Sequence, residues 1–169
     1  YDFKKNLEAK TALCEAAEKL DEEEDVISAF HQLQDLHQQY REIGPVAKEL
    51  REQIWSRFKA ASTVINKKHQ QYFEDIRAKE EKNLELKTAL CEKLEAIDLD
   101  AIKTAAQWEA TTKEVIAMQQ EWREIGFAPQ KMNVKIFERF RTINDVFFSK
   151  KAERSEEHTS ELQSLREIS

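Results

Sequence analysis

Basic side chains at matching spacings are the residues in this sequence most able to bind a charged partner. Arg57 and Lys68 lie eleven positions apart, as do Arg139 and Lys150. Eleven residues of α-helix turn through about 1100°, which is within about 20° of three full turns, so each pair lies on one helix face. With their neighbours, the candidate partner-binding residues are Trp55, Arg57, Lys67, Lys68, Phe137, Arg139, Lys150 and Lys151.

These cations allow two interpretations. One is a repeated basic strip that binds phosphates or an acidic protein surface, with Arg41 and Arg123 beside it. The other is a solvated face whose cations pair with nearby carboxylates, or an Arg57 that braces the end of a helix. The formal net charge of −6 favours the second interpretation, because it gives the chain no overall attraction to nucleic acid or to an anionic membrane.

Other chemistries have little support in the residue pattern. Gly44 and Gly126 are the only two glycines, so neither a P-loop nor a dinucleotide-binding loop can be built. The histidines lack the spacing of helical metal ligands, and Cys14 and Cys91 stand alone. We therefore expect no catalytic residue, no metal and no cofactor. Two separate thiols also suit a reducing cytoplasm better than a disulfide framework.

The aromatic residues could grip a partner or stack on bases, but most fall on apolar helix stripes. Phe58 and Phe140 lie on these stripes, and Tyr40 and Trp122 stand beside the two glycine turns. We therefore expect most of the aromatic rings to be core. Trp55 and Phe137 each sit one position off a stripe, so we expect them to be partly exposed.

The elements that carry these residues repeat along the chain. Residues 5–15 return as residues 82–92, 77 positions later, and residues 40–44 and 54–59 return 82 positions later, at 122–126 and 136–141. The change from 77 to 82 places a five-residue insertion near residues 97–107. Such internal repetition is typical of helical arrays, whose units bury their apolar faces against one another.

Apolar residues at helical spacing predict five helices, at about 2–20, 25–43, 47–97, 104–126 and from 130 onward. Thr104 and Gln107 have the spacing of a capping box, and Gly44 before Pro45 is expected to end its helix as a left-handed cap. Polar residues 77–83 predict a solvated bridge between two packing units. The fold class is therefore all-α, with antiparallel helix hairpins joined by long, coiled-coil-like helices.

These motifs resemble those of a tandem bacterial family known as domain of unknown function 349. The resemblance rests on an aromatic-Arg-Glu-Ile-Gly turn at 40–44 and 122–126, an Ile-aromatic-x-Arg-Phe run at 54–58 and 136–140, and Asn-Leu-x-x-Lys-x-x-Leu-Cys-Glu at 6–15 and 83–92. It covers residues 4–151 and implies a multi-repeat helical protein with no established activity. The implied organisation is the end of a preceding repeat at 1–20, a complete repeat at 26–97 and a truncated repeat at 104–153.

The last segment of the chain has a different character. Residues 154–164 read Arg-Ser-Glu-Glu-His-Thr-Ser-Glu-Leu-Gln-Ser, which resembles the translation of a DNA-sequencing adapter, and residues 165–169 fit the adapter's index and continuation. The alternative is a genuine polar tail. We interpret 154–169 as adapter-derived and assign it no function.

Together these patterns predict a cytoplasmic, non-enzymatic scaffold or protein-interaction module whose protein partners the sequence does not identify. The alternative is a nucleic-acid-binding or ribosome-associated protein that uses the same basic strip. Self-association through Leu84 and Leu90 of the long helix is a third possibility. No apolar run approaches the roughly 20 residues of a membrane span.

Overall fold

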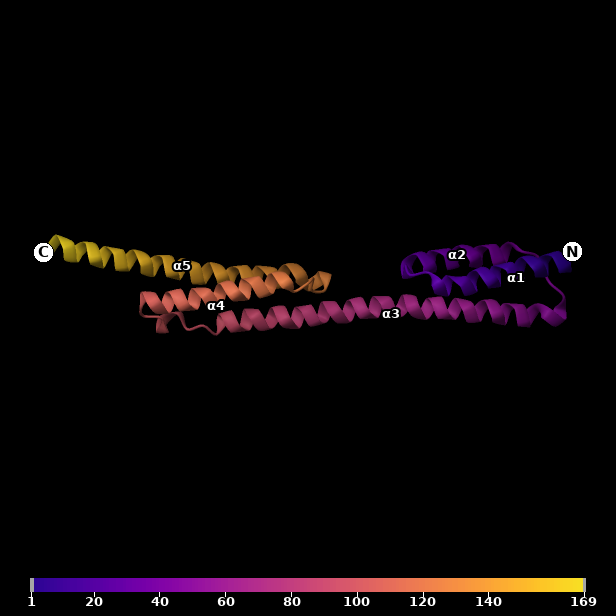
Figure 1. Ribbon diagram of the computed structural model, residues 1–169, viewed down its shortest axis with the longest axis horizontal. Helices are drawn as coiled ribbons and strands as arrows, with labels where there is room; N and C mark the ends of the chain where they lie inside the picture. The colour runs from indigo at the N-terminus through magenta and orange to yellow at the C-terminus, as the bar shows by residue number, and fades with distance from the viewer. Residues whose placement is uncertain (1, 169) are drawn as a thin grey trace. The chain divides into compact units, whose positions relative to one another are not determined.

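The computed structural model describes residues 2–168, with the side chains of 2–157 and 163–166. Within this range the chain forms five α-helices, two short 3₁₀ turns at Leu20–Glu22 and Leu99–Ala101, and no strand. The predicted all-α class is confirmed. The helices are α1 (Phe3–Lys19), α2 (Val26–Glu42), α3 (Lys48–Glu95), α4 (Ala105–Glu124) and α5 (Gln130–Ile168) (Figure 1).

Local side-chain caps determine where the hairpin helices begin. The Asp25 carboxylate accepts hydrogen bonds of 3.1 Å from the backbone N–H groups of Ile27 and Ser28 at the start of α2. At the start of α4, Thr104 and Gln107 form the predicted capping box. These side chains satisfy backbone donors that have no partner inside the helix, so both helix starts follow from short-range sequence.

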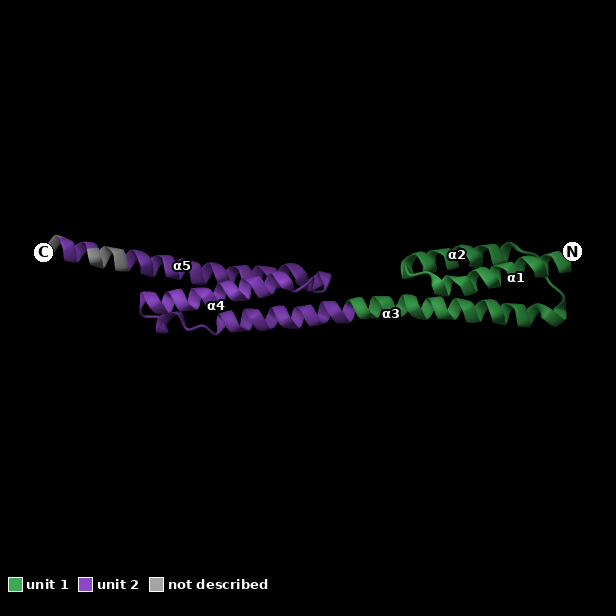
Figure 2. Ribbon diagram, viewed as in Figure 1, with its two compact units in different colours: residues 1–76 green, residues 77–169 purple. Residues whose placement is uncertain are grey.

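The chain divides into two compact units, residues 1–76 and 77–169 (Figure 2). The division falls within α3, at the edge of the polar segment 77–83 that the sequence predicts to be a bridge. Each unit combines one helix hairpin with the helical segment that precedes it. The packing units therefore begin earlier in the chain than the sequence repeats at 26 and 104.

In unit 1, α1 and α2 pack against the first part of α3 around an aromatic centre. Phe58 is completely buried, and its ring stacks on that of Tyr40 with the centroids 4.7 Å apart. Cys14 of α1 is also completely buried, and its thiol lies 3.6 Å from the Ile54 carbonyl oxygen of α3. The core thus takes one apolar stripe from each helix, as the helical spacing predicts.

Unit 2 repeats this arrangement with the last part of α3, α4 and α5. Trp122 stacks on Phe140 with ring centroids 4.0 Å apart and an interplanar angle of 9°. Leu90 and Cys91 of α3 lie in the same core, and Leu84 packs against it. The two leucines considered for self-association are therefore already used inside the unit.

The predicted left-handed cap at Gly44 is wrong. No residue in the described part of the chain, glycine included, has a positive φ. The C-cap residues that follow α2 and α4, Ile43 and Ile125, have extended backbone, with φ −74° and ψ 138° at Ile43. Gly44 precedes Pro45, and a residue before proline is restricted to extended conformations, so this turn has no left-handed residue.

Close approach by a neighbouring helix is what requires glycine in these turns. The Asn6 side-chain amide donates a 2.7 Å hydrogen bond to the Pro45 carbonyl oxygen, and a Cβ on Gly44 would lie 2.8 Å from its nitrogen. In unit 2, Asn83 donates a 2.9 Å bond to the Phe127 carbonyl oxygen, and a Cβ on Gly126 would lie 3.0 Å from its nitrogen. The asparagine of the preceding helix thus fixes the turn of each hairpin through a hydrogen bond.

Substitution of Phe58 by Ala is expected to lower the free energy of unfolding by about 3–5 kcal/mol, because a fully buried ring is lost and a cavity remains. Urea denaturation followed by circular dichroism measures this change. A loss below about 1 kcal/mol would contradict the burial of this ring.

Substitution of Gly44 by Ala is expected to cost about 1 kcal/mol of stability, because the new methyl group displaces the Asn6 amide from its hydrogen bond. In an Asn6→Ala background the same substitution is expected to be neutral, or stabilising by about 0.4–1 kcal/mol, since the backbone conformation suits alanine. Denaturation of the four proteins in this double-mutant cycle provides the comparison. An equal loss in both backgrounds would show that glycine is required for its conformation instead.

Candidate functional site

The two predicted binding arginines make the same ion pair in each unit. Arg57 binds Glu18 through two hydrogen bonds of 2.8 and 3.2 Å, and Arg139 binds Glu95 in the same bidentate manner. Both pairs lie on the surface, where the guanidinium group lowers the pKa of each carboxylate below its ordinary value. These contacts join α3 to α1 in unit 1, and α5 to α3 in unit 2.

The lysines of the predicted strip differ between the units. Lys68 binds the Asp21 carboxylate and lies 3.1 Å from the Asp21 carbonyl oxygen, whereas Lys150 makes a 3.9 Å pair with Glu153 of its own helix. Lys67 is exposed and has no ion pair among the described side chains. The carboxylate pairing that the sequence offered as an alternative thus accounts for four of the six strip cations. A partner-binding role for these residues stays a prediction.

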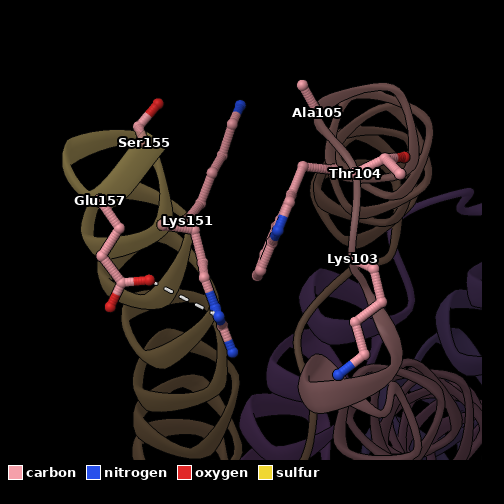
Figure 3. Close-up of a pocket in the computed structure, with 8 residues that line it drawn as sticks. Lys103, Thr104, Ala105, Lys151, Ser155 and Glu157 are labelled. Atoms are coloured by element: carbon pink, nitrogen blue, oxygen red, sulfur yellow. Dashed lines mark ion pairs between the residues drawn. The ribbon is translucent and has the colours of Figure 1, made fainter. Parts of the chain in front are cut away.

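Lys151 lines a pocket of about 250 Å³ between the start of α4 and α5 (Figure 3). Lys103, Thr104 and Ala105 face it from the α4 side, and Ser155 and Glu157 line it from α5. Ser155 and Glu157 belong to segment 154–169, which resembles a translated sequencing adapter. Arg154 Nε is buried there without a hydrogen-bond partner, which folded proteins rarely allow. We therefore do not treat this pocket as the functional site.

A second cavity lies between α4 and α5, and we call it the aromatic groove. It has a volume of about 450 Å³ and is lined by Gln119, Trp122, Arg123, Phe137, Phe140, Arg141 and Asn144. Phe137 is 50% exposed, although Phe140 three residues later is buried. An apolar wall is therefore combined with two cations in one open groove.

Unit 1 places the same kinds of side chain at the equivalent positions. Trp55 is 43% exposed, and its ring centroid lies 5.4 Å from that of Tyr40. Arg41 and Lys59 stand where unit 2 has Arg123 and Arg141. The predicted partial exposure of Trp55 and Phe137 is confirmed, and both rings lie outside the stacked aromatic pair of their unit.

A polar pair crosses each hairpin beneath these rings. In unit 2 the Gln119 amide donates a 2.8 Å hydrogen bond to the Asn144 side-chain oxygen, and Asn144 donates to the Phe140 carbonyl oxygen at 2.7 Å. In unit 1 the His37 ring nitrogen lies 2.8 Å from the Ser62 hydroxyl. Burial lowers the pKa of His37, and the nearby charge of Arg41 adds to this effect.

Sequence reasoning placed Arg123 beside its turn but did not connect Arg141, Gln119 or Asn144 with a site. The available signal was helical spacing: Phe137 and Arg141 are four residues apart, and so are Trp55 and Lys59. Four residues place an aromatic and a cation on one helix face. The occurrence of this aromatic–cation pair in both repeats would have marked these residues as a candidate site.

The remaining chemically active groups are held inside the units. The ammonium groups of Lys10 and Lys87 lie 4.7 and 4.8 Å from the Tyr40 and Trp122 ring centroids, a cation–π arrangement. Burial lowers the pKa of Lys87 and raises the pKa values of the Cys14 and Cys91 thiols. A raised thiol pKa disfavours the reactive thiolate, so these cysteines serve as core residues.

The described part of the chain holds no cluster of three or more His, Cys, Asp or Glu side chains arranged to bind a metal ion. None of its helices combines the length and the apolar character needed to cross a bilayer.

Comparison with known proteins gives one match. A family model described as Domain of Unknown Function (DUF349) matches residues 1–49 and 53–131. No curated protein and no solved structure matches the chain.

The stability of unit 1 is expected to fall as the pH drops below about 6.5. The pKa of His37 is lower in the folded protein than in the unfolded chain, so the unfolded chain takes up protons first. The neutral His37 contact is complete above that pH and is lost as the pH falls through the folded-state pKa. Urea midpoints between pH 7.5 and 5 measure this dependence.

The double variant His37→Gln, Ser62→Asn copies the Gln119–Asn144 pair of unit 2 and serves as the matched control. It is expected to have a smaller loss of stability over this pH range. An unchanged loss would show that His37 is not the group responsible.

Proposed function

The chain belongs to the Domain of Unknown Function (DUF349) family, and we propose that it serves as a non-enzymatic helical scaffold that binds other proteins. The exposed aromatic ring at the same place in both units carries this proposal. Trp55 and Phe137 are 43% and 50% exposed beside buried aromatic partners. Aromatic residues are enriched at protein interfaces, where covering them with a partner removes apolar surface from water.

The form of the units supports a binding role over catalysis. Catalysis requires a partly dry site with convergent reactive groups. The aromatic groove instead offers rings, amides and guanidinium groups that can bind but cannot readily transfer a proton or attack a substrate. The thiols, which are the strongest nucleophiles among the described residues, are completely buried.

Nucleic-acid binding through the basic strip is the alternative that the capture experiment distinguishes. Arg57, Arg139 and Lys68 each bind a carboxylate of their own unit, so fewer positive charges are available for phosphates. We further propose that the protein works in a bacterial cytoplasm, an inference supported by the family resemblance and by two cysteines without a disulfide.

Capture from a bacterial lysate on the immobilised chain, with and without nuclease, tests the proposal. A protein-binding scaffold is expected to retain the same captured proteins after nuclease treatment, and to lose most of them in the double variant Trp55→Ala, Phe137→Ala. Both positions are half-exposed, so this variant is expected to keep its helical content, which circular dichroism checks. Complete loss of the captured set on nuclease treatment would instead favour the nucleic-acid alternative.

A further inference from the structure

The arginines of the aromatic groove differ from those of the predicted strip because they have no acidic partner. Arg139 binds Glu95, but Arg141, two residues later on α5, has no ion pair among the described residues. Arg123, on the α4 side of the groove, also has no ion pair among the described residues, and the side chains of Arg123 and Arg141 are both exposed. The groove therefore presents two positive charges that the unit itself does not neutralise.

Apolar surface lies between these charges. Trp122 and Phe140 form the stacked wall of the groove, and Phe137 stands half-exposed at its side. Val134, which is 64% exposed, precedes Phe137 by three residues and extends the same face of α5. A ligand that matches this surface needs an apolar side chain flanked by negative charge.

Unit 1 has the same combination. Trp55 takes the place of Phe137, and the flanking cations are Arg41 and Lys59. Arg41 donates a hydrogen bond to the neutral Gln38 amide, and neither cation has an ion pair among the described side chains. The ion pairs of unit 1 therefore do not include Arg41 or Lys59. Among the described residues, both units have two cations without an ion pair beside an exposed ring.

We propose that the aromatic groove of unit 2 and the equivalent surface of unit 1 each bind an acidic amphipathic helix of a partner protein. In unit 2 an apolar side chain of that helix packs between Trp122 and Phe137, while its carboxylates bind Arg123 and Arg141. The groove runs between two adjacent helices, a surface on which a third helix can lay its apolar face. Guanidinium groups recognise carboxylates through paired hydrogen bonds, so charge sets the orientation of the incoming helix. This inference rests on the proposed protein-binding function.

Charge and geometry favour an acidic helix over single-stranded nucleic acid. Strand-binding grooves combine several phosphate contacts with successive stacking rings. Each unit here offers two cations without an ion pair among the described residues and one half-exposed ring, and Arg57 and Arg139 of the strip are bound to carboxylates. An acidic helix needs only one apolar anchor and two carboxylates.

The test uses the full chain and a fluorescein-labelled helical peptide of about 18 residues, roughly five turns, with leucines along one face and glutamates beside them. A twin peptide has glutamine in place of every glutamate. Fluorescence anisotropy is expected to show the acidic peptide binding at least about tenfold more tightly than its neutral twin. Equal affinity for the twins would overturn the proposal.

The acidic peptide should lose at least about tenfold in affinity when the two groove cations and their two counterparts in unit 1 are reversed together. This variant carries Arg41→Glu, Lys59→Glu, Arg123→Glu and Arg141→Glu. The matched control reverses four exposed cations outside the groove and has the same net charge; it carries Lys4→Glu, Lys48→Glu, Lys113→Glu and Lys135→Glu. We expect the control to bind within about threefold of wild type, because it keeps the groove. An equal loss in both variants would mean general charge attraction and would contradict the proposal.

A reciprocal exchange guards against a folding defect. A peptide with lysine in place of each glutamate should bind the groove-reversed variant more tightly than the matched control, which has the same net charge; a misfolded protein would show no such preference. Tighter binding of poly-uridine RNA than of the acidic peptide, with the same dependence on the groove cations, would assign the site to nucleic acid instead. Nuclease-resistant capture that persists in the groove-reversed variant would overturn the groove proposal while leaving the scaffold function intact.

Discussion

Stacking of one aromatic pair, with the phenylalanine ring buried, is the interaction on which each unit depends. Tyr40 with Phe58, and Trp122 with Phe140, join the two helices of a hairpin, but two helices cannot enclose such rings. The preceding helix covers them with its leucine and cysteine stripe, and its lysine lies over the outer ring. Water is therefore excluded from the core of such a hairpin only when the end of the preceding helix packs on it. For this reason a packing unit contains parts of two sequence repeats.

The same constraint explains the glycine turns and the arginine pairs. The asparagine of the preceding helix that covers the rings also approaches the turn, and a Cβ in place of Gly44 or Gly126 would crowd its amide. Arg57 and Arg139 then bind a glutamate of that helix on the outside of the contact. Exposed ion pairs of this type contribute little to stability, but they define which helix faces which.

The proposed function rests on the surface that this packing leaves uncovered. The face between the two hairpin helices is not needed to close the core, yet it retains an exposed ring and two cations without carboxylate partners in both units. A solvated helix face would ordinarily mix opposite charges along its length. The combination of aromatic and basic residues without ion pairs is what connects the fold to the proposed binding.

Short-range patterns in the sequence determined the helices, the repeat, the capping box at Thr104 and the burial of Phe58, because these depend on residues a few positions apart. The roles of Gly44, Arg57 and Arg141 were decided only by tertiary structure. A glycine just after a helix predicts a left-handed cap, but the close approach of Asn6 comes from 38 residues earlier in the chain. Likewise, Arg57 and Arg139 form ion pairs with glutamates 39 and 44 residues earlier in the chain. Helical spacing alone therefore could not distinguish these paired arginines from Arg141, which has no ion pair among the described residues.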